Sequence, residues 1–179
     1  MKCFGLIGNP LGHSFSPLIH KHLFGIKNID ASYKLLETTP ENLKKRIDEL
    51  KSGEYDGFNV TIPYKIEIMK YLDEISPEAL AIGSVNTICM KNGKVVGYNT
   101  DYFGFKRELE YYNIKVEKQN AYVLGTGGAS KAITKALENM NANVTLVSRH
   151  PKNNIIGYED LKSKKIDLIV NTTPVGMYD

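Results

Sequence analysis

Short apolar runs alternate along the chain with segments whose apolar residues recur every three or four positions. The runs predict strands over residues 4–7, 32–36, 57–60, 85–90, 94–98, 121–124, 144–147 and 167–171. The periodic segments predict helices over 17–24, 40–50, 65–72, 77–82, 100–112 and 129–140. Strands that alternate with helices are typical of an α/β fold with parallel strands.

Local signals place several element ends. Ser16 precedes Pro17 and is predicted to cap the first helix. Lys65 is predicted to begin the third helix, where a cation opposes the helix dipole, which is a mild sign that it serves a ligand. On this signal alone, a solvated surface lysine is the favoured alternative. Asn92-Gly93, between two apolar runs, predicts a β-hairpin.

The pattern of a strand followed by a helix starts again after a polar stretch at residues 113–120. We therefore expect an α/β domain over residues 1–112 and a second one over residues 113–179. The second has about three predicted strands, which is fewer than a complete dinucleotide-binding domain contains.

Composition narrows the class of protein. The chain has 179 residues, 42% of them hydrophobic and 24% charged, with a net charge of +3 and no basic block. This predicts a soluble globular protein without a nucleic-acid partner, and no apolar stretch approaches membrane-spanning length. Cys3 and Cys89 lie far apart, which predicts two free thiols in a reducing compartment and no metal site. We expect a cytoplasmic protein.

A glycine-rich loop lies between a predicted strand and a predicted helix, and it includes Gly125, Thr126, Gly127, Gly128 and Ala129. Such a loop lets the backbone approach a pyrophosphate, which the helix N-terminus then binds. Ser130 stands where the common GxGxxG pattern has its third glycine. A structural turn is the alternative, but the strand–loop–helix–strand setting favours a dinucleotide.

The end of the next predicted strand indicates which dinucleotide binds. Ser148, Arg149 and His150 stand where proteins that bind NAD usually carry an acid for the ribose, and Lys152 follows. A solvated basic loop is the alternative. Because Arg149 can bind a 2′-phosphate, the sequence favours NADP.

Polar residues gather at element ends in the first half of the chain. Ser14 and Ser16 put two hydroxyls beside a helix N-terminus, a suitable cradle for a carboxylate. Thr61, Asn86 and Asp101 also lie where predicted elements begin or end. Each has a structural alternative, but ligand clefts form at such ends in α/β domains.

These segments together resemble the shikimate dehydrogenase family. The matching pieces, in family order, are Gly8-Asn9-Pro10, residues 13–17, the NVTIPYK segment at 59–65, Val85-Asn86-Thr87, Gly97-Tyr98-Asn99-Thr100-Asp101, the glycine loop, and residues 171–177. They cover the chain from end to end, and the NVTIPYK and NTD segments are highly specific.

The resemblance implies an N-terminal α/β substrate domain and a C-terminal Rossmann-like NADP domain. The implied reaction is the reversible NADPH-dependent reduction of 3-dehydroshikimate to shikimate, in aromatic amino-acid biosynthesis. By position, Lys65 and Asp101 correspond to the catalytic pair. The implied substrate contacts are Ser14, Ser16, Thr61 and Asn86. The predicted cofactor contacts are Gly125, Thr126, Gly127, Gly128, Ala129, Ser148, Arg149, Lys152 and Thr172.

The chain departs from the family in two places. Ser148 and His150 replace the usual residues on either side of Arg149. The sequence also stops at Asp179, inside the last matching motif, so we expect only the N-terminal half of a Rossmann-like domain. Because the domain would be incomplete, we expect weak NADP binding and little activity. Exposed apolar residues such as Ile169 near one sheet edge would favour self-association, including a homodimer. The alternatives are a quinate/shikimate dehydrogenase of the same family and a non-catalytic shikimate-binding fragment.

Overall fold

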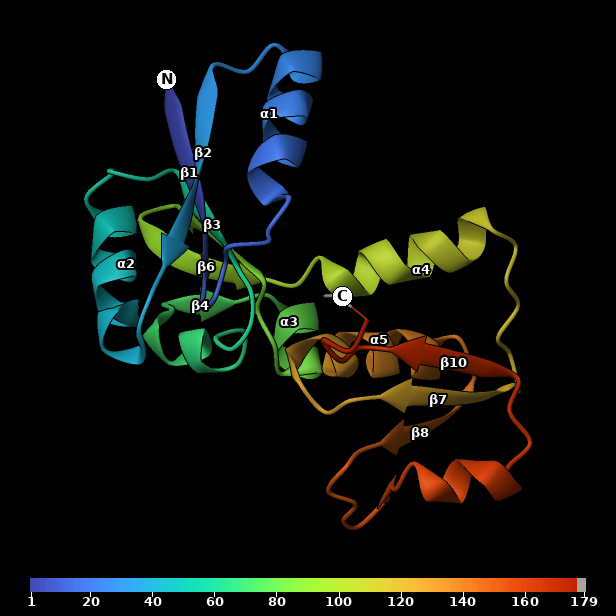
Figure 1. Cartoon of the computed structure of the whole chain (residues 1–179). Coiled ribbons are helices and arrows are strands. Elements are labelled where there is room, and N and C mark those ends of the chain that lie inside the picture. The colour runs from blue at the N-terminus through green and yellow to red at the C-terminus, as the bar shows by residue number, and fades with distance from the viewer. Residues whose placement is uncertain (177–179) are drawn as a thin grey trace. The chain divides into compact units, whose positions relative to one another are not determined.

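The computed structural model describes residues 1–176 of the chain (Figure 1). It divides into two compact units, Met1–Asn99 and a second that begins at Thr100. Each unit contains its own sheet and its own core of buried apolar side chains.

The first unit contains a six-stranded sheet in the order β2-β1-β3-β5-β6-β4. Its strands are β1 (Lys2–Gly8), β2 (Ala31–Glu37), β3 (Gly57–Val60), β4 (Glu74–Ile75), β5 (Thr87–Lys91) and β6 (Lys94–Tyr98). β1 runs parallel to β2 and β3, whereas β5 runs antiparallel to β3 and β6. The sheet is therefore mixed. The predicted hairpin joins β5 to β6, and it is closed by Asn92 and Gly93, which take positive φ angles of 52° and 76°.

Helices lie on both faces of this sheet. The unit contains α1 (Ser16–Lys27), η1 (Pro40–Asn42), α2 (Leu43–Lys51), η2 (Glu67–Tyr71) and α3 (Pro77–Ile82). α2 buries Leu43, Ile47 and Leu50 in the main core together with Ile7 and Ile88. α1 lies on the opposite face, where Phe24 contacts Phe4 of β1 with 5.7 Å between ring centroids.

Two predictions about element starts are wrong. Phe15, not Ser16, is the N-cap of α1, and no side chain caps the helix because phenylalanine has no polar side-chain atom; the Ser16 hydroxyl accepts a hydrogen bond from Ser14. Lys65 lies in a turn ahead of the 3-10 helix η2 rather than at the start of an α-helix. The turn follows from the Tyr64 side chain, which is buried and donates from its hydroxyl to the Thr38 carbonyl at 2.6 Å.

The second unit contains a sheet of four parallel strands in the order β10-β7-β8-β9. These strands are β7 (Asn120–Leu124), β8 (Asn143–Val147), β9 (Ile155–Ile156) and β10 (Leu168–Asn171), and the helices are α4 (Asp101–Tyr111), α5 (Gly128–Asn139) and η3 (Glu159–Ser163). Counted within the unit, the order is 4-1-2-3, that of the first four strands of a Rossmann fold. The sequence missed β9 because two residues show no periodicity.

Helix α4 belongs to the second unit. Leu109 of α4 is buried with Val116, Val123 and Leu137, and Tyr102 accepts a hydrogen bond from Asn139 of α5 at 3.0 Å. The sequence predicted a division in the polar stretch 113–120, whereas the contacts divide the chain between Asn99 and Thr100. The predicted and the observed boundary differ by helix α4. This helix belongs to the second unit because its apolar face packs against elements that follow it in the chain.

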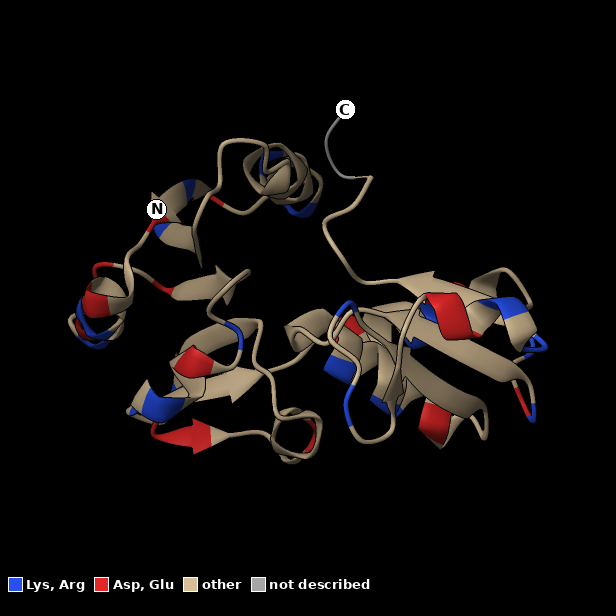
Figure 2. Ribbon diagram, turned by 60° about the horizontal axis from the view of Figure 1, so that its bottom comes forward, with Lys and Arg blue, Asp and Glu red and all other residues tan. Residues whose placement is uncertain are grey.

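Charged residues of both signs are distributed over both units (Figure 2). This agrees with the small net charge of +3. In the part of the chain that the structure describes, no helix combines the length and the apolar character needed to cross a membrane.

Candidate active site

The ends of β1 and β3 lie side by side, and their close approach requires a glycine. Thr61 donates its backbone N–H to the Ile7 carbonyl at 2.9 Å, and Asn9 donates to the Ile62 carbonyl at 3.1 Å. A Cβ atom on Gly8 would come within 2.5 Å of the Thr61 methyl group. Gly8 therefore allows the two predicted site segments, Gly-Asn-Pro and NVTIPYK, to meet.

Backbone hydrogen bonds bring Lys65 and Asn86 into the same region. Val85 donates to the Lys65 carbonyl at 2.8 Å, and Val60 donates to the Asn86 carbonyl at 2.8 Å. Asn86 in turn donates to the Tyr98 carbonyl at 3.0 Å, and its side chain is 7% exposed. The segment that follows β3 is thus held against the residues just ahead of β5, at Val60 and at Lys65 itself.

The two predicted serines form a pair at the start of α1. The Ser14 hydroxyl donates to the Ser16 hydroxyl at 3.1 Å and accepts the Ser16 backbone N–H at 3.3 Å. Their loop is anchored because Leu11 donates its N–H to the Glu37 carboxylate at 2.8 Å. The hydrogen bond holds the two hydroxyls together as a pair. Because both serines are only half-buried, a small anion can reach these hydroxyls.

The structure adds three residues that sequence reasoning missed. The Tyr33 hydroxyl donates to Asn59 Oδ1 at 2.8 Å, Asn59 Nδ2 donates to Thr87 Oγ1 at 3.1 Å, and Thr87 donates to Asn86 Oδ1 at 3.0 Å. The sequence carried a signal for Asn59, since asparagine is depleted in strands and this one lies within β3. Tyr33 gave no such signal, because a tyrosine is ordinary in a strand.

Asp101 is the first residue of α4 in the second unit, whereas Lys65 lies in the first unit. Asn99 is 2% exposed and donates from Nδ2 to the Ser84 carbonyl at 2.9 Å. This contact fixes the backbone two residues ahead of Asp101. The acidic residue also stands in the first turn of its helix, a favourable position for a negative charge.

The glycine loop of the second unit connects β7 to α5. Gly125 has a φ of 110°, and a Cβ there would come within 2.8 Å of the Thr172 hydroxyl oxygen. Gly127 is the N-cap of α5 and Gly128 its first residue. Ser130, in place of the third glycine, is buried and donates from its hydroxyl to the Gly127 carbonyl at 2.7 Å. The loop therefore has the backbone approach and the helix N-terminus that a pyrophosphate needs.

The loop lies where the strand order of the second sheet reverses, between β7 and β10. Thr172, directly after β10, donates its N–H and its hydroxyl to the Leu124 carbonyl, at 2.9 and 2.7 Å. Ligands of open α/β sheets bind at such a switch point, beyond the carboxyl ends of the strands. Met177, the last residue of the predicted motif there, lies outside the described residues.

The basic segment after β8 is held by its backbone while its cations face solvent. Ser148 donates its N–H to the Ile156 carbonyl at 2.9 Å, and its hydroxyl accepts the His150 N–H at 3.1 Å. Arg149 and Lys152 are exposed. The segment follows the strand beside β7, so it occupies the place from which a Rossmann domain reads the ribose of its cofactor.

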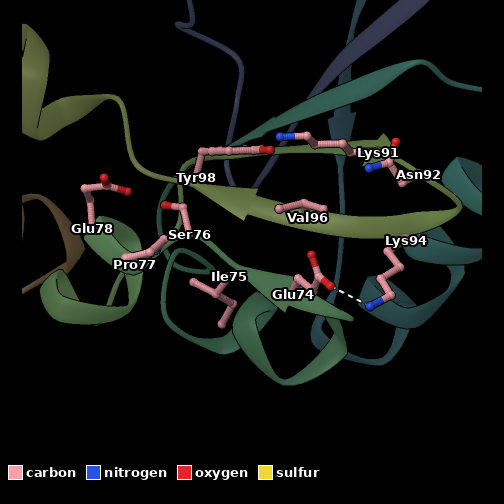
Figure 3. A pocket seen from close by; sticks show the side chains of 10 residues that line it. All are labelled: Glu74, Ile75, Ser76, Pro77, Glu78, Lys91, Asn92, Lys94, Val96 and Tyr98. Atoms are coloured by element: carbon pink, nitrogen blue, oxygen red, sulfur yellow. Dashed lines mark hydrogen bonds and ion pairs between the residues drawn. The ribbon is translucent and has the colours of Figure 1, made fainter.

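Two of the hollows in the described part of the chain are lined by residues of the first unit alone. A cavity of about 240 Å³ is lined by Phe4, His20, Phe24, Tyr33, Gly57, Phe58, Asn59, Thr87, Ile88 and Cys89. A wider one of about 570 Å³ lies along β4, β6 and the start of α3, where Lys94 pairs with Glu74 (Figure 3). No predicted site residue lines either hollow. Within residues 1–176 no group of three or more His, Cys, Asp or Glu residues could hold a metal ion.

An α/β substrate unit joined to a Rossmann-type unit with a glycine loop defines a dinucleotide-dependent enzyme of two domains. Residues 6–88 match the family profile described as the shikimate dehydrogenase substrate binding domain. Together with relatives that are more than 40% identical over 99% of this chain, the match shows that the chain belongs to the shikimate dehydrogenase family.

Individual relatives agree with this assignment. The chain is 46% identical over 188 residues to a shikimate dehydrogenase (NADP(+)) of Clostridium beijerinckii, covering 99% of this chain and 70% of that protein. Among solved structures, shikimate dehydrogenase 1 of Peptoclostridium difficile is similar with a TM-score of 0.92 and 47% identity, over 99% of this chain and 68% of that one. The shikimate 5-dehydrogenase of Thermus thermophilus, in complex with NADP(H) and shikimate, has a TM-score of 0.88 and 33% identity, over 98% and 70%.

Proposed function

We propose that the protein catalyses the reversible NADPH-dependent reduction of 3-dehydroshikimate to shikimate in aromatic amino-acid biosynthesis. The observation that carries this proposal is the meeting of five short segments, 8–10, 14–16, 59–65, 85–87 and 98–99, in one hydrogen-bonded region of the first unit. Relatives that are more than 40% identical to the chain over the aligned residues carry the name of this enzyme.

The substrate would be held by hydroxyl and amide groups. Ser14 and Ser16, already paired at 3.1 Å, would turn their hydroxyl protons to the carboxylate. Thr61 and Asn86 would contact the ring hydroxyls. The Asn86 oxygen accepts from Thr87, so its amide N–H groups are the side of the group that can donate to a ring oxygen.

Lys65 and Asp101 would form the catalytic pair. When a ketone is reduced, an alkoxide develops and must receive a proton. An ammonium at Lys65 would stabilise the developing charge and supply that proton, and in the reverse direction it would take the proton back. Asp101 would orient Lys65 and bind a substrate hydroxyl.

The glycine loop and the basic segment would hold the cofactor. NADPH, when bound, supplies the hydride. The pyrophosphate would lie on the backbone of Gly125, Thr126, Gly127, Gly128 and Ala129, with Thr172 supporting the loop from β10. Ser148, Arg149 and Lys152 would surround the 2′-phosphate, since two exposed cations and no acid follow β8.

We also propose that the enzyme works in the cytoplasm as a homodimer. Two free cysteines fit a reducing compartment, which also supplies NADPH. Leu35, an exposed apolar side chain on the edge strand β2, lies on a surface through which strands of two copies could pair.

A spectrophotometric assay tests the proposed activity. The chain is mixed with shikimate and NADP, then with NAD, and then with quinate in place of shikimate, while the absorbance of the reduced nicotinamide is followed. Turnover with shikimate and NADP, well above the other pairs, is the expected result. Faster turnover of quinate would assign a quinate dehydrogenase instead, and shikimate binding without turnover would assign a non-catalytic binding protein.

A further inference from the structure

Tyr33, Asn59, Thr87 and Asn86 form a hydrogen-bonded chain whose direction the structure fixes. Asn59 Nδ2 lies 3.4 Å from the Asn86 carbonyl oxygen, which can only accept, so the Asn59 oxygen faces Tyr33 and the phenol donates to it. Thr87 accepts from Asn59 Nδ2 and donates to Asn86 Oδ1. Each donor thus points one way, from β2 toward Asn86, and hydrogen bonds aligned in this way reinforce one another.

Strand register explains why the first three of these side chains meet. Asn59 stands opposite Thr87 across β3 and β5, and Tyr33 stands opposite Phe4 across β2 and β1. Side chains alternate between the faces of a sheet, so Tyr33, Asn59 and Thr87 present their side chains to the face that carries α1. The same three residues form the polar wall of the 240 Å³ cavity on that face.

His20 fixes the ring of Tyr33. The two rings stack with centroids 3.9 Å apart and planes 15° apart. His20 Nδ1 lies 2.8 Å from the Ser16 carbonyl oxygen, so this nitrogen carries the proton and donates. No residue of α1 is fully buried, and this stack is, with the contact of Phe24 on Phe4, one of the ring contacts that hold the helix on the sheet.

Tyr33 also lies beside the serine pair. Burial raises the pKa of the phenol to about 12, and a hydrogen bond with the Ser16 hydroxyl acts in the opposite direction. The phenol therefore stays protonated throughout the physiological range and donates at all times. It connects the start of α1, where Ser14 and Ser16 lie, with the strands that carry Asn59 and Asn86.

We propose that Tyr33 is a positioning residue that couples the serine pair to the side-chain amides of Asn59 and Asn86. The carboxylate of a ring-shaped hydroxy acid, at the serines, and its ring hydroxyls, at the amides, are then bound together. This inference rests on the proposed function, since it concerns the same substrate site. Tyr33 acts through Asn59 and, by its stack on His20, through the Ser16 backbone, rather than on the reacting atoms. Its loss should weaken binding of the hydroxy acid and leave the chemical step and cofactor binding unchanged.

The test compares Tyr33→Phe with Tyr55→Phe. Phenylalanine keeps the stack on His20 and removes only the hydroxyl, whose hydrogen bond typically accounts for about a two- to twelvefold change in an equilibrium constant. Tyr55 is buried in the same unit against Phe58, and its hydroxyl takes no part in the network, so Tyr55→Phe is the matched control. Shikimate and NADP affinities are measured by titration calorimetry, KM and kcat by the assay above, and folding by circular dichroism.

Tyr33→Phe should raise the shikimate Kd and KM by about two- to twelvefold and leave kcat and the NADP Kd unchanged. Tyr55→Phe should behave like the wild type in all four quantities. Thr87→Val breaks the next link, and the double variant should lose less than the product of the two single effects, because both act on one chain.

Unchanged shikimate affinity in Tyr33→Phe, or strictly multiplicative effects in the double variant, would overturn the coupling while leaving the proposed function intact. A wild-type chain that does not bind shikimate would overturn the proposed function and, with it, this role of Tyr33.

Discussion

Gly125 and Thr172, 47 positions apart in sequence, are packed so closely that the Thr172 hydroxyl oxygen would lie 2.8 Å from a Cβ on Gly125. The contact joins the glycine loop after β7 to the segment after β10. Both segments are thereby held at the switch point of the second sheet, where we propose that the cofactor binds.

Gly125→Ala should destabilise the second unit and weaken NADP binding. The residue has a φ of 110°, a conformation that alanine adopts only under strain, and its methyl group would press on Thr172. We expect a loss of about 1–3 kcal/mol in the free energy of unfolding. Thermal and urea unfolding measure this loss, and titration with NADP measures the affinity.

Gly127→Ala is the matched control for this prediction. Gly127 has a φ of −82°, and nothing lies within 4 Å of a Cβ built on it, so the folded chain should accept the methyl group. Equal destabilisation by the two substitutions would show that the close approach to Thr172 does not decide the stability of the loop.

Lys65→Ala should lower kcat by about 100- to 10,000-fold, because the proposed proton donor is lost. Asp101→Asn should lower kcat as well, and the double variant should be little slower than the worse single variant if the two residues act as one unit. The assay of shikimate oxidation measures all three. Lys70→Ala, at an exposed lysine of η2, is the control and should keep normal turnover. A near-normal kcat in Lys65→Ala would refute its catalytic role.

Arg149→Ala should weaken NADP about ten- to 150-fold and leave NAD unchanged. The substitution removes a charge-assisted hydrogen bond to the 2′-phosphate, which NAD lacks. Titration of both cofactors provides the measurement. Lys164→Ala removes an exposed cation of the same unit and controls for the general effect of charge. Equal losses for NADP and NAD would mean that Arg149 does not recognise the phosphate.

The alkaline stability of the protein should depend on Tyr33. Burial raises the pKa of its phenol from 10.0 to about 12, against the opposing effect of Ser16. Between these values the unfolded chain has lost the proton and the folded chain keeps it, so the free energy of unfolding falls as pH rises. Burial also raises the pKa of Tyr55 and Tyr64, which contribute with the same sign.

Tyr33→Phe should therefore show a shallower loss of stability than the wild type when urea unfolding is followed from about pH 9 to about pH 12. The remaining slope would belong to the other buried tyrosines. An identical slope in the variant would contradict the burial of the Tyr33 phenol in solution.

Several features of the protein followed from sequence alone because they depend on neighbouring residues. The hairpin at Asn92-Gly93 and the buried face of α2, with Leu43 and Ile47, are set by local conformational preference and by helical periodicity. The glycine loop after β7 is also a local pattern. The family assignment needed no more than short motifs in order, and the comparisons confirm it.

Tertiary structure alone decided what depends on residues far apart in the chain. The sequence could not show that Tyr33 donates to Asn59, because this contact requires the register of β2, β1 and β3. It also misplaced the start of the helix near Lys65, since a hydrogen bond between Tyr64 and Thr38, 26 positions apart, sets that turn. Helix α4 joined the second unit because Leu109 finds its apolar partners there. Local pattern fixes which elements form, whereas burial and strand pairing between distant segments decide which side chains meet.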